Sequence, residues 1–271
     1  MMIALAKNTA LPLLCLIIAS CTAAPPGASA DASSTAASGN VEATSPVTAQ
    51  PAPPVEPAEP VRTQLTLDGV VRQGGIVLAR VPTGTTTLRL DGNELPITDD
   101  GYVLLGFNRD ADPDATLSWT VNGTEQTRSL SVIPGTWRLE RVNLSLPRGR
   151  KASQRRAGEL AQIRGARAQS HASDGWRQDF IWPVNYREVP GGRLSGFFGA
   201  QRIYRGTPGG YHTGLDIAAP TGTPFVAPAD GVVTLATPQP FSREGYLLMV
   251  DHGMGLNSAF VHCSQIVVKV G

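Results

Sequence analysis

A hairpin signal in the middle of the chain limits the possible folds more than any other feature of the sequence. Residues 117–121 alternate apolar and polar side chains, Asn122 and Gly123 follow, and residues 130–132 resume the alternation. A period of two is typical of strands that bury one face. Asn-Gly is a favoured pair for a two-residue type I′ turn. The sequence therefore predicts a mainly β structure here.

Further short apolar runs, separated by turn residues, precede this hairpin. They span residues 76–81, 86–90 and 102–105. About seven short strands with frequent turns are typical of a small β-sandwich, which we assign to residues 63–146. This region holds no recognisable catalytic constellation. A spacer role and a role in positioning or presenting substrate both remain open.

The N-terminal part of the chain has a different character. Residues 1–20 are predicted to be an export signal, with Lys7 before an apolar stretch too short to span a bilayer permanently. Residues 21–62 consist mostly of Ala, Pro, Ser, Thr and Gly, without an aromatic residue. Such a segment cannot bury enough apolar surface to offset its chain entropy. We expect it to be a disordered tether.

The junction of these two segments, Ile18-Ala19-Ser20-Cys21, resembles the bacterial lipobox. The resemblance implies that Cys21 is acylated and becomes the new N-terminus. Thr22 in place of aspartate implies an outer-membrane lipoprotein facing the periplasm of a Gram-negative bacterium. An ordinary secretory signal with a chance cysteine, or a membrane anchor, are the alternatives.

Residues 147–178 are strongly basic. Seven basic residues and one acid, Glu159, lie between positions 148 and 167. A basic helix on anionic lipid or wall polymer is one interpretation. Gly158 and Gly165 each cost a helix about 1 kcal/mol relative to alanine, so a solvated linker is favoured. The formal net charge of the chain is only +1, which argues against nucleic acid as the main partner.

The last third of the chain, residues 179–271, carries groups that can hold a metal. His212 and Asp216 are four residues apart, which in a flat strand is roughly 13 Å. Two donors on one zinc ion must lie within about 4 Å of one another. The backbone must therefore bend, and Gly214 can supply the bend. Taken alone, such a pair is more often an ordinary polar pair than a metal site.

A second histidine follows a strand-like run fifty residues later. His262 comes directly after Ala259-Phe260-Val261. A neutral imidazole there could accept a proton from water or donate to a developing oxyanion. Cys263 should point to the opposite face and into packing, because neighbours in a strand alternate. With Cys15 in the signal and Cys21 acylated, no intramolecular disulfide is expected.

Several motifs surround these residues, and their order resembles that of the LytM/lysostaphin-type zinc metallopeptidases, family M23, over about residues 180–271. The motifs are Ser195-Gly196-Phe197-Phe198-Gly199, Gln201-Arg202, His212-Thr213-Gly214-Leu215-Asp216-Ile217, Ala227-Pro228-Ala229-Asp230-Gly231-Val232-Val233, Asp251-His252-Gly253 and Val261-His262-Cys263-Ser264. The segment Phe107-Asn108-Arg109-Asp110-Ala111 resembles a sequence motif in the N-terminal accessory domain of some of these peptidases.

The resemblance implies a specific chemistry. His212 and Asp216 would be zinc ligands, and His262 a catalytic histidine that does not bind the metal. The implied activity is zinc-dependent hydrolysis of peptide cross-links in peptidoglycan. The expected architecture is mainly β: a small β-sandwich domain, then an incomplete antiparallel-sheet peptidase domain, with a disordered N-terminal tether.

One departure from the family affects the expected activity. The family places a His-x-His pair about thirty residues beyond the equivalent of His262, and its second histidine completes the zinc shell. No such pair occurs up to Gly271, whereas a catalytic zinc normally has three protein ligands. We therefore expect a peptidase domain truncated at its C-terminus, with an inactive wall-binding regulator or an inactive fragment as alternatives. His171 is expected to be solvated and His252 to lie at an ordinary strand end.

Overall fold

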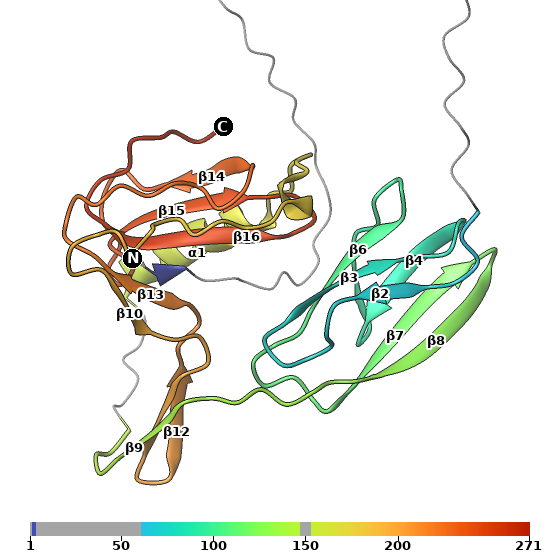
Figure 1. Ribbon diagram of the computed structural model, residues 1–271, viewed down its shortest axis with the longest axis horizontal. Helices are drawn as coiled ribbons and strands as arrows, with labels where there is room; N and C mark the ends of the chain where they lie inside the picture. Colours follow the sequence, from blue (N-terminus) through green and yellow to red (C-terminus); the bar gives the residue numbers. More distant parts are fainter. Residues whose placement is uncertain (1, 4–60, 147–152) are drawn as a thin grey trace, which may run out of the picture. The chain divides into compact units, whose positions relative to one another are not determined.

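The computed structural model describes residues 2–3, 61–146 and 153–271. These residues form several small sheets, one α-helix and one short 3-10 helix, η1 (Gly175–Arg177) (Figure 1). The predicted mainly β class is confirmed. Within the described ranges, no helix is both long and apolar enough to cross a membrane. Cys21, the tether before residue 61 and most of the export signal lie outside the described residues.

The first half of the described chain forms two sheets around one core. One sheet has the order β2-β3-β6 and the other the order β5-β4-β7-β8. Alternate side chains of β7 are buried, as the period-two pattern predicts. Val77, Leu88, Leu105 and Leu117 are fully buried in this core. The strands are β2 (Thr66–Asp68), β3 (Ile76–Arg80), β4 (Thr85–Leu90), β5 (Asn93–Glu94), β6 (Tyr102–Gly106), β7 (Asp114–Val121) and β8 (Thr124–Ser131).

The hairpin between β7 and β8 has the predicted turn. Val121 pairs with Thr124, and both central residues have positive φ, 51° for Asn122 and 76° for Gly123. This is the type I′ geometry, which follows the twist of the flanking strands. β8 begins at Thr124, well before the apolar alternation at residues 130–132. Its first six residues are exposed, so the hydrophobic pattern does not reveal them, and they belong to the strand because they pair with β7.

Another three-stranded sheet has the order β12-β11-β9. β9 (Leu139–Val142) falls in the range assigned to the sandwich, but it pairs in parallel with β11 (Gln201–Tyr204). β11 in turn forms a hairpin with β12 (Thr207–Tyr211). The four residues of β9 are largely exposed. Nothing in so short and solvated a strand identifies its partner from sequence.

Within the described part of the basic region, residues 154–168 form a helix, not the solvated linker that the sequence favours. α1 (Gln154–Ala168) begins after Ser153, whose side chain accepts a hydrogen bond from the amide of Arg156 at 3.2 Å. Such an N-cap contributes about 1 kcal/mol. Ile163 and Ala166 are buried against the main sheet. Burial of this face offsets the two glycines, because most helix stability in proteins comes from tertiary packing.

The largest sheet lies in the C-terminal part and is antiparallel throughout. Its order is β10-β13-β1-β16-β15-β14. α1 packs on one face through Leu247, Met249 and Val261, while Leu248, Val250 and Phe260 form a cluster on the other. β1 lies within the predicted export signal, yet its backbone pairs with β13 and β16. The strands are β1 (Met2–Ile3), β10 (Arg193–Gly196), β13 (Leu215–Ala218), β14 (Val232–Ala236), β15 (Tyr246–Asp251) and β16 (Asn257–Cys263).

Candidate metal centre

The sequence-predicted pair His212 and Asp216 is brought together. His212 follows the end of β12, the chain bends at Gly214, and Asp216 lies in β13. The Nε2 atom of His212 is 3.1 Å from Oδ1 of Asp216. The bend that the spacing requires is therefore present, and it converts a four-residue separation into side-chain contact.

The imidazole of His212 is oriented from its other side. Its Nδ1 atom lies 3.1 Å from the carbonyl oxygen of Phe197. A carbonyl only accepts, so Nδ1 carries the proton and donates, and Nε2 is the nitrogen that faces Asp216. This is the arrangement by which outer contacts fix the tautomer of a metal-binding histidine. The backbone is fixed too, because the amide of His212 donates to Ala200 and its carbonyl accepts from Gly199, both at 2.8 Å.

Gly196 gives this pair its space. A Cβ atom at position 196 would lie 2.1 Å from Oδ2 of Asp216 and 3.1 Å from Cε1 of His212. The first contact requires the carboxylate to move, and the second is tighter than ordinary van der Waals contact. β10 and β13 pair here across an irregularity, with Gly196 opposite Asp216. The sequence motif contains Gly196, but only the structure shows that its missing side chain makes room for the pair.

The pair fits two corners of a zinc site. Ligand bonds of about 2.0–2.1 Å in a tetrahedron place two donor atoms about 3.3 Å apart, and the observed separation is 3.1 Å. The donor types, an imidazole nitrogen and a carboxylate oxygen, also suit zinc. Among the residues that the structure describes, no third His, Cys, Asp or Glu joins them to form a group of three.

His262 lies on β16 at a β-bulge. Tyr246 pairs with Cys263 and Leu248 with Phe260, so Leu247 faces two residues, Val261 and His262. The bulge places His262 on the same face of the strand as Val261. Its φ is +59° and its side chain is exposed. Its amide donates to the carbonyl of Glu244 at 2.7 Å.

Backbone register relates His262 to the pair. Asp216 and Val261 are both opposite Met2 of β1, on its two sides. Strands are spaced by about 4.8 Å, so the Cα atoms of Asp216 and Val261 lie about 10 Å apart, on one face of the sheet. His262, the next residue along β16, is therefore two strands away from the pair and not part of it.

The remaining histidines and the cysteine have structural surroundings. His252 is fully buried, with Nδ1 2.7 Å from the carbonyl of Asp230 and Nε2 2.9 Å from the hydroxyl of Ser258. His171 is not solvated as expected, because its amide donates to Asp251 at 2.8 Å and its ring contacts the same carboxylate at 3.0 Å. Cys263 packs against the cluster around Phe260, as the alternation predicts, and burial raises the pKa of its thiol.

A loop after β6 also reaches the turn that holds His212. Nε and an amino group of Arg109 donate to the carbonyl of Gly199 at 3.2 and 3.1 Å. The guanidinium lies 5.3 Å from the ring centroids of both Trp137 and Tyr211. Gly199 is the residue whose amide binds the carbonyl of His212. The segment 107–111 thus contacts the backbone next to the candidate ligand.

Comparison with known proteins shows which family the C-terminal segment is similar to. A model of peptidase family M23 matches residues 210–271. A peptidoglycan DD-endopeptidase of Vibrio cholerae serotype O1, ShyA, is 37% identical over 60 residues, which are 22% of this chain and 14% of that protein. The aligned part thus spans well under two thirds of the relative. His212, Asp216 and His262 all lie inside the matched segment.

Proposed function

Because residues 210–271 form a segment of the M23 peptidase type, we propose that the protein is a zinc metalloendopeptidase that hydrolyses peptide cross-links of peptidoglycan. The observation that carries the proposal is the 3.1 Å approach of His212 Nε2 to Asp216, with Nδ1 of the same ring held by Phe197. The similarity to a peptidoglycan endopeptidase supports the choice of substrate.

Each residue then has a defined task. His212 and Asp216 would hold the metal through Nε2 and a carboxylate oxygen, and Gly196 leaves room for both side chains. A catalytic zinc lowers the pKa of water to about 7 and polarises a carbonyl. The exposed imidazole of His262, on the same face, accepts a proton from the attacking water or donates to the developing oxyanion.

The test is cleavage of purified cross-linked muropeptides by the full chain. We expect hydrolysis that stops on chelation and returns with zinc, and loss of at least about a hundredfold in Asp216→Asn and His212→Ala. Asp112→Asn is the matched control, because Asp112 is an exposed aspartate of the sandwich. Hydrolysis that survives chelation or His212→Ala would contradict the zinc mechanism.

A second function is a wall-binding regulator of other peptidoglycan hydrolases that does not itself cut. The absence of a third ligand side chain from the described residues favours it. Metal analysis and wall pull-down of the purified protein separate the two. A regulator binds peptidoglycan without cleaving it and retains less than one zinc per chain, whereas the peptidase retains one.

The proposed compartment is the outer membrane. An acylated Cys21 would anchor the protein there, with the rest of the chain facing the periplasm. The lipobox-like run before Cys21 supports this proposal. Growth of the expressing bacterium with a labelled fatty acid tests it. Label should enter the wild-type chain and not a Cys21→Ser variant, and equal labelling of the two would remove the lipid anchor from the proposal.

A further inference from the structure

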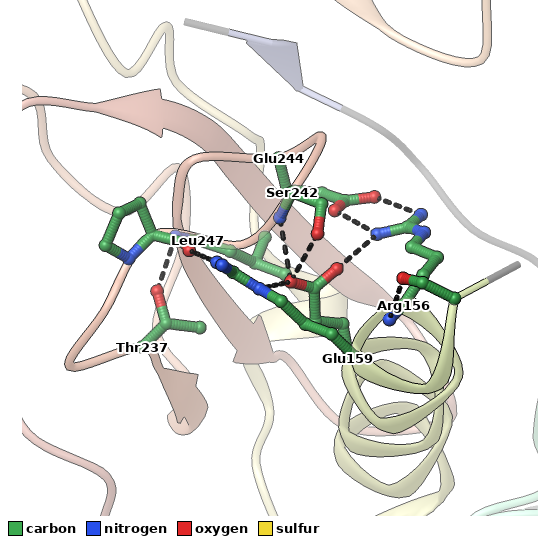
Figure 2. Close-up of polar contacts among 9 residues, drawn as sticks. Arg156, Glu159, Thr237, Ser242, Glu244 and Leu247 are labelled. Atoms are coloured by element: carbon green, nitrogen blue, oxygen red, sulfur yellow. Dashed lines mark hydrogen bonds and ion pairs between the residues drawn. The ribbon is translucent and has the colours of Figure 1, made fainter.

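α1 is joined to the main sheet by a polar cluster in which a buried carboxylate is central (Figure 2). The side chain of Glu159 is 5% exposed and accepts from the amide and hydroxyl of Ser242, at 2.8 and 2.7 Å, and from Arg155 and Arg156. Burial by itself raises the pKa of Glu159, but these hydrogen bonds outweigh it and lower the pKa to about 2. The only acid between positions 148 and 167 is therefore the one that attaches the helix to the sheet.

A second contact in this cluster involves Glu244, whose carbonyl accepts the amide hydrogen of His262. Arg156 binds both carboxylate oxygens of Glu244, at 2.5 and 2.8 Å. The two side chains are 15% and 20% exposed, so this pair is much better shielded from solvent than a surface salt bridge. Planar two-point binding of this kind fixes orientation as well as distance.

Glu244 lies in a short closed loop directly before β15. Phe241 and Gly245 exchange backbone hydrogen bonds, at 2.8 and 3.1 Å, across the loop. α1 thus binds this loop at two points, at Ser242 through Glu159 and at Glu244 through Arg156. Figure 2 shows both attachments arising from one end of the helix.

The same loop sets the backbone of His262. The carbonyl of Glu244 accepts the amide of His262 at 2.7 Å. A Cβ at Gly245 would lie 3.5 Å from the Cα of His262, so the loop packs directly against that residue. His262 has a φ of +59°, which is unfavourable for a residue with a side chain and persists only where the surroundings impose it.

We propose that Arg156 of α1 is a positioning residue for His262, which it acts on through the Glu244 carboxylate and the carbonyl of the same residue. The helix is then part of the catalytic apparatus, because without it the loop is free to move and the bulge at His262 is not maintained. The inference rests on the proposed function only for the use made of His262.

The experiment compares amide hydrogen exchange by NMR in the full chain carrying Arg156→Ala or Arg155→Ala. Arg155 is the matched control, since it neighbours Arg156 and binds Glu159 and the carbonyl of Pro240, just before the loop, whereas the bonds to Glu244 come from Arg156. We expect Arg156→Ala to speed exchange of the His262 amide by about tenfold or more, and Arg155→Ala to change it by less than about threefold.

A merely structural role predicts a different pattern. If Arg156 only attaches the helix, exchange should rise equally at Ile163 in α1 and at His262. That result, or an unchanged His262 amide in Arg156→Ala, would overturn the proposal. Glu244→Gln is the second variant should Arg156→Ala fail to fold. It keeps the backbone carbonyl and removes the charge, and its His262 amide should also exchange faster.

These measurements need neither zinc nor hydrolysis, so they remain informative if the peptidase function fails. If the peptidase is active, Arg156→Ala should lower kcat by about tenfold or more with KM nearly unchanged, because His262 acts in the transition state. The zinc content of the variant should remain that of wild type, since neither His212 nor Asp216 contacts the loop or the helix.

Discussion

Gly196 shows how much one missing side chain can decide at the residue scale. Neither the strand pattern nor the His-x-x-x-Asp spacing requires a glycine there. The requirement arises because β10 runs beside β13, so that position 196 faces the gap between His212 and Asp216. A metal site on a sheet needs such a gap, since two ligands and an ion must occupy the space of ordinary side chains.

Gly196→Ala should therefore weaken zinc binding without unfolding the protein. Displacement of the Asp216 carboxylate by the new methyl group is expected to lower zinc affinity by about tenfold to a hundredfold, as measured by competition with a chromogenic chelator. Gly210→Ala is the control, because a Cβ there meets nothing within 4 Å. Equal zinc affinity in the two variants would contradict the assigned role of Gly196.

His252 should make stability depend on pH. Desolvation lowers its pKa, although the Asp230 carbonyl and the Asp251 carboxylate favour the charged form. The unfolded chain, with a histidine pKa of about 6.5, then binds a proton that the folded chain does not. Stability should fall as pH decreases below about 6.5, down to the lower folded-state pKa.

Urea unfolding at about pH 7.5 and about pH 5.5 measures this dependence. His252→Gln should reduce the loss of stability between the two values, because glutamine does not titrate and can both donate and accept. His171, which contacts the adjacent Asp251, is unchanged in the variant. An identical loss in wild type and His252→Gln would show that His252 is not responsible.

At the scale of single elements, the residues of a turn predicted its geometry, but the sequence did not predict which elements β9 and α1 pack against. The Asn122-Gly123 turn follows from its two residues alone, since both accept positive φ. β9 and α1 could not be assigned with the same certainty. The exposed β9 is defined by β11, and α1 depends on burial of Ile163 and on Glu159, neither of which is visible in a basic, glycine-containing stretch.

Two glycine substitutions in different elements should act in opposite directions. Gly123→Ala should lower the free energy of unfolding by about 1–2 kcal/mol, because the position has a φ of 76°. Gly158→Ala should raise it by about 0.5–1 kcal/mol, because a Cβ on this helical residue meets nothing within 4 Å. Urea unfolding checks both, and a shift of the same sign in the two would contradict the turn or the helix assignment.

At the scale of the whole molecule, Arg109 gives the loop after β6 a structural task. Its side chain is 8% exposed, makes two charge-assisted hydrogen bonds to Gly199, and lies 5.3 Å from the ring centroids of Trp137 and Tyr211. A Cβ at Gly199 would lie 2.1 Å from Trp137, so the sequence is adapted to this close contact. The spacer interpretation of residues 63–146 leaves this contact unexplained.

Arg109→Ala should lower the free energy of unfolding by about 2–3 kcal/mol, as removal of a buried charged donor leaves the Gly199 carbonyl unpaired. The exposed Arg128 of β8 supplies the control, and Arg128→Ala should change stability by less than about 0.5 kcal/mol. Zinc affinity should also fall in Arg109→Ala alone, because Gly199 holds the backbone of His212. Equal stability of the two variants would remove Arg109 from this role.

The sequence by itself determined the β class, the type I′ turn, the need for a bend between His212 and Asp216, and the opposite orientation of Cys263, because each follows from local geometry. Only the tertiary structure decided which strands pair, that residues 154–168 form a helix, that Gly196 makes room for the pair and that Glu244 holds His262. Those features depend on contacts between residues distant in sequence, such as Arg156 and Glu244 or Gly196 and Asp216. The free energy of such contacts comes from burial and geometry that no local pattern records.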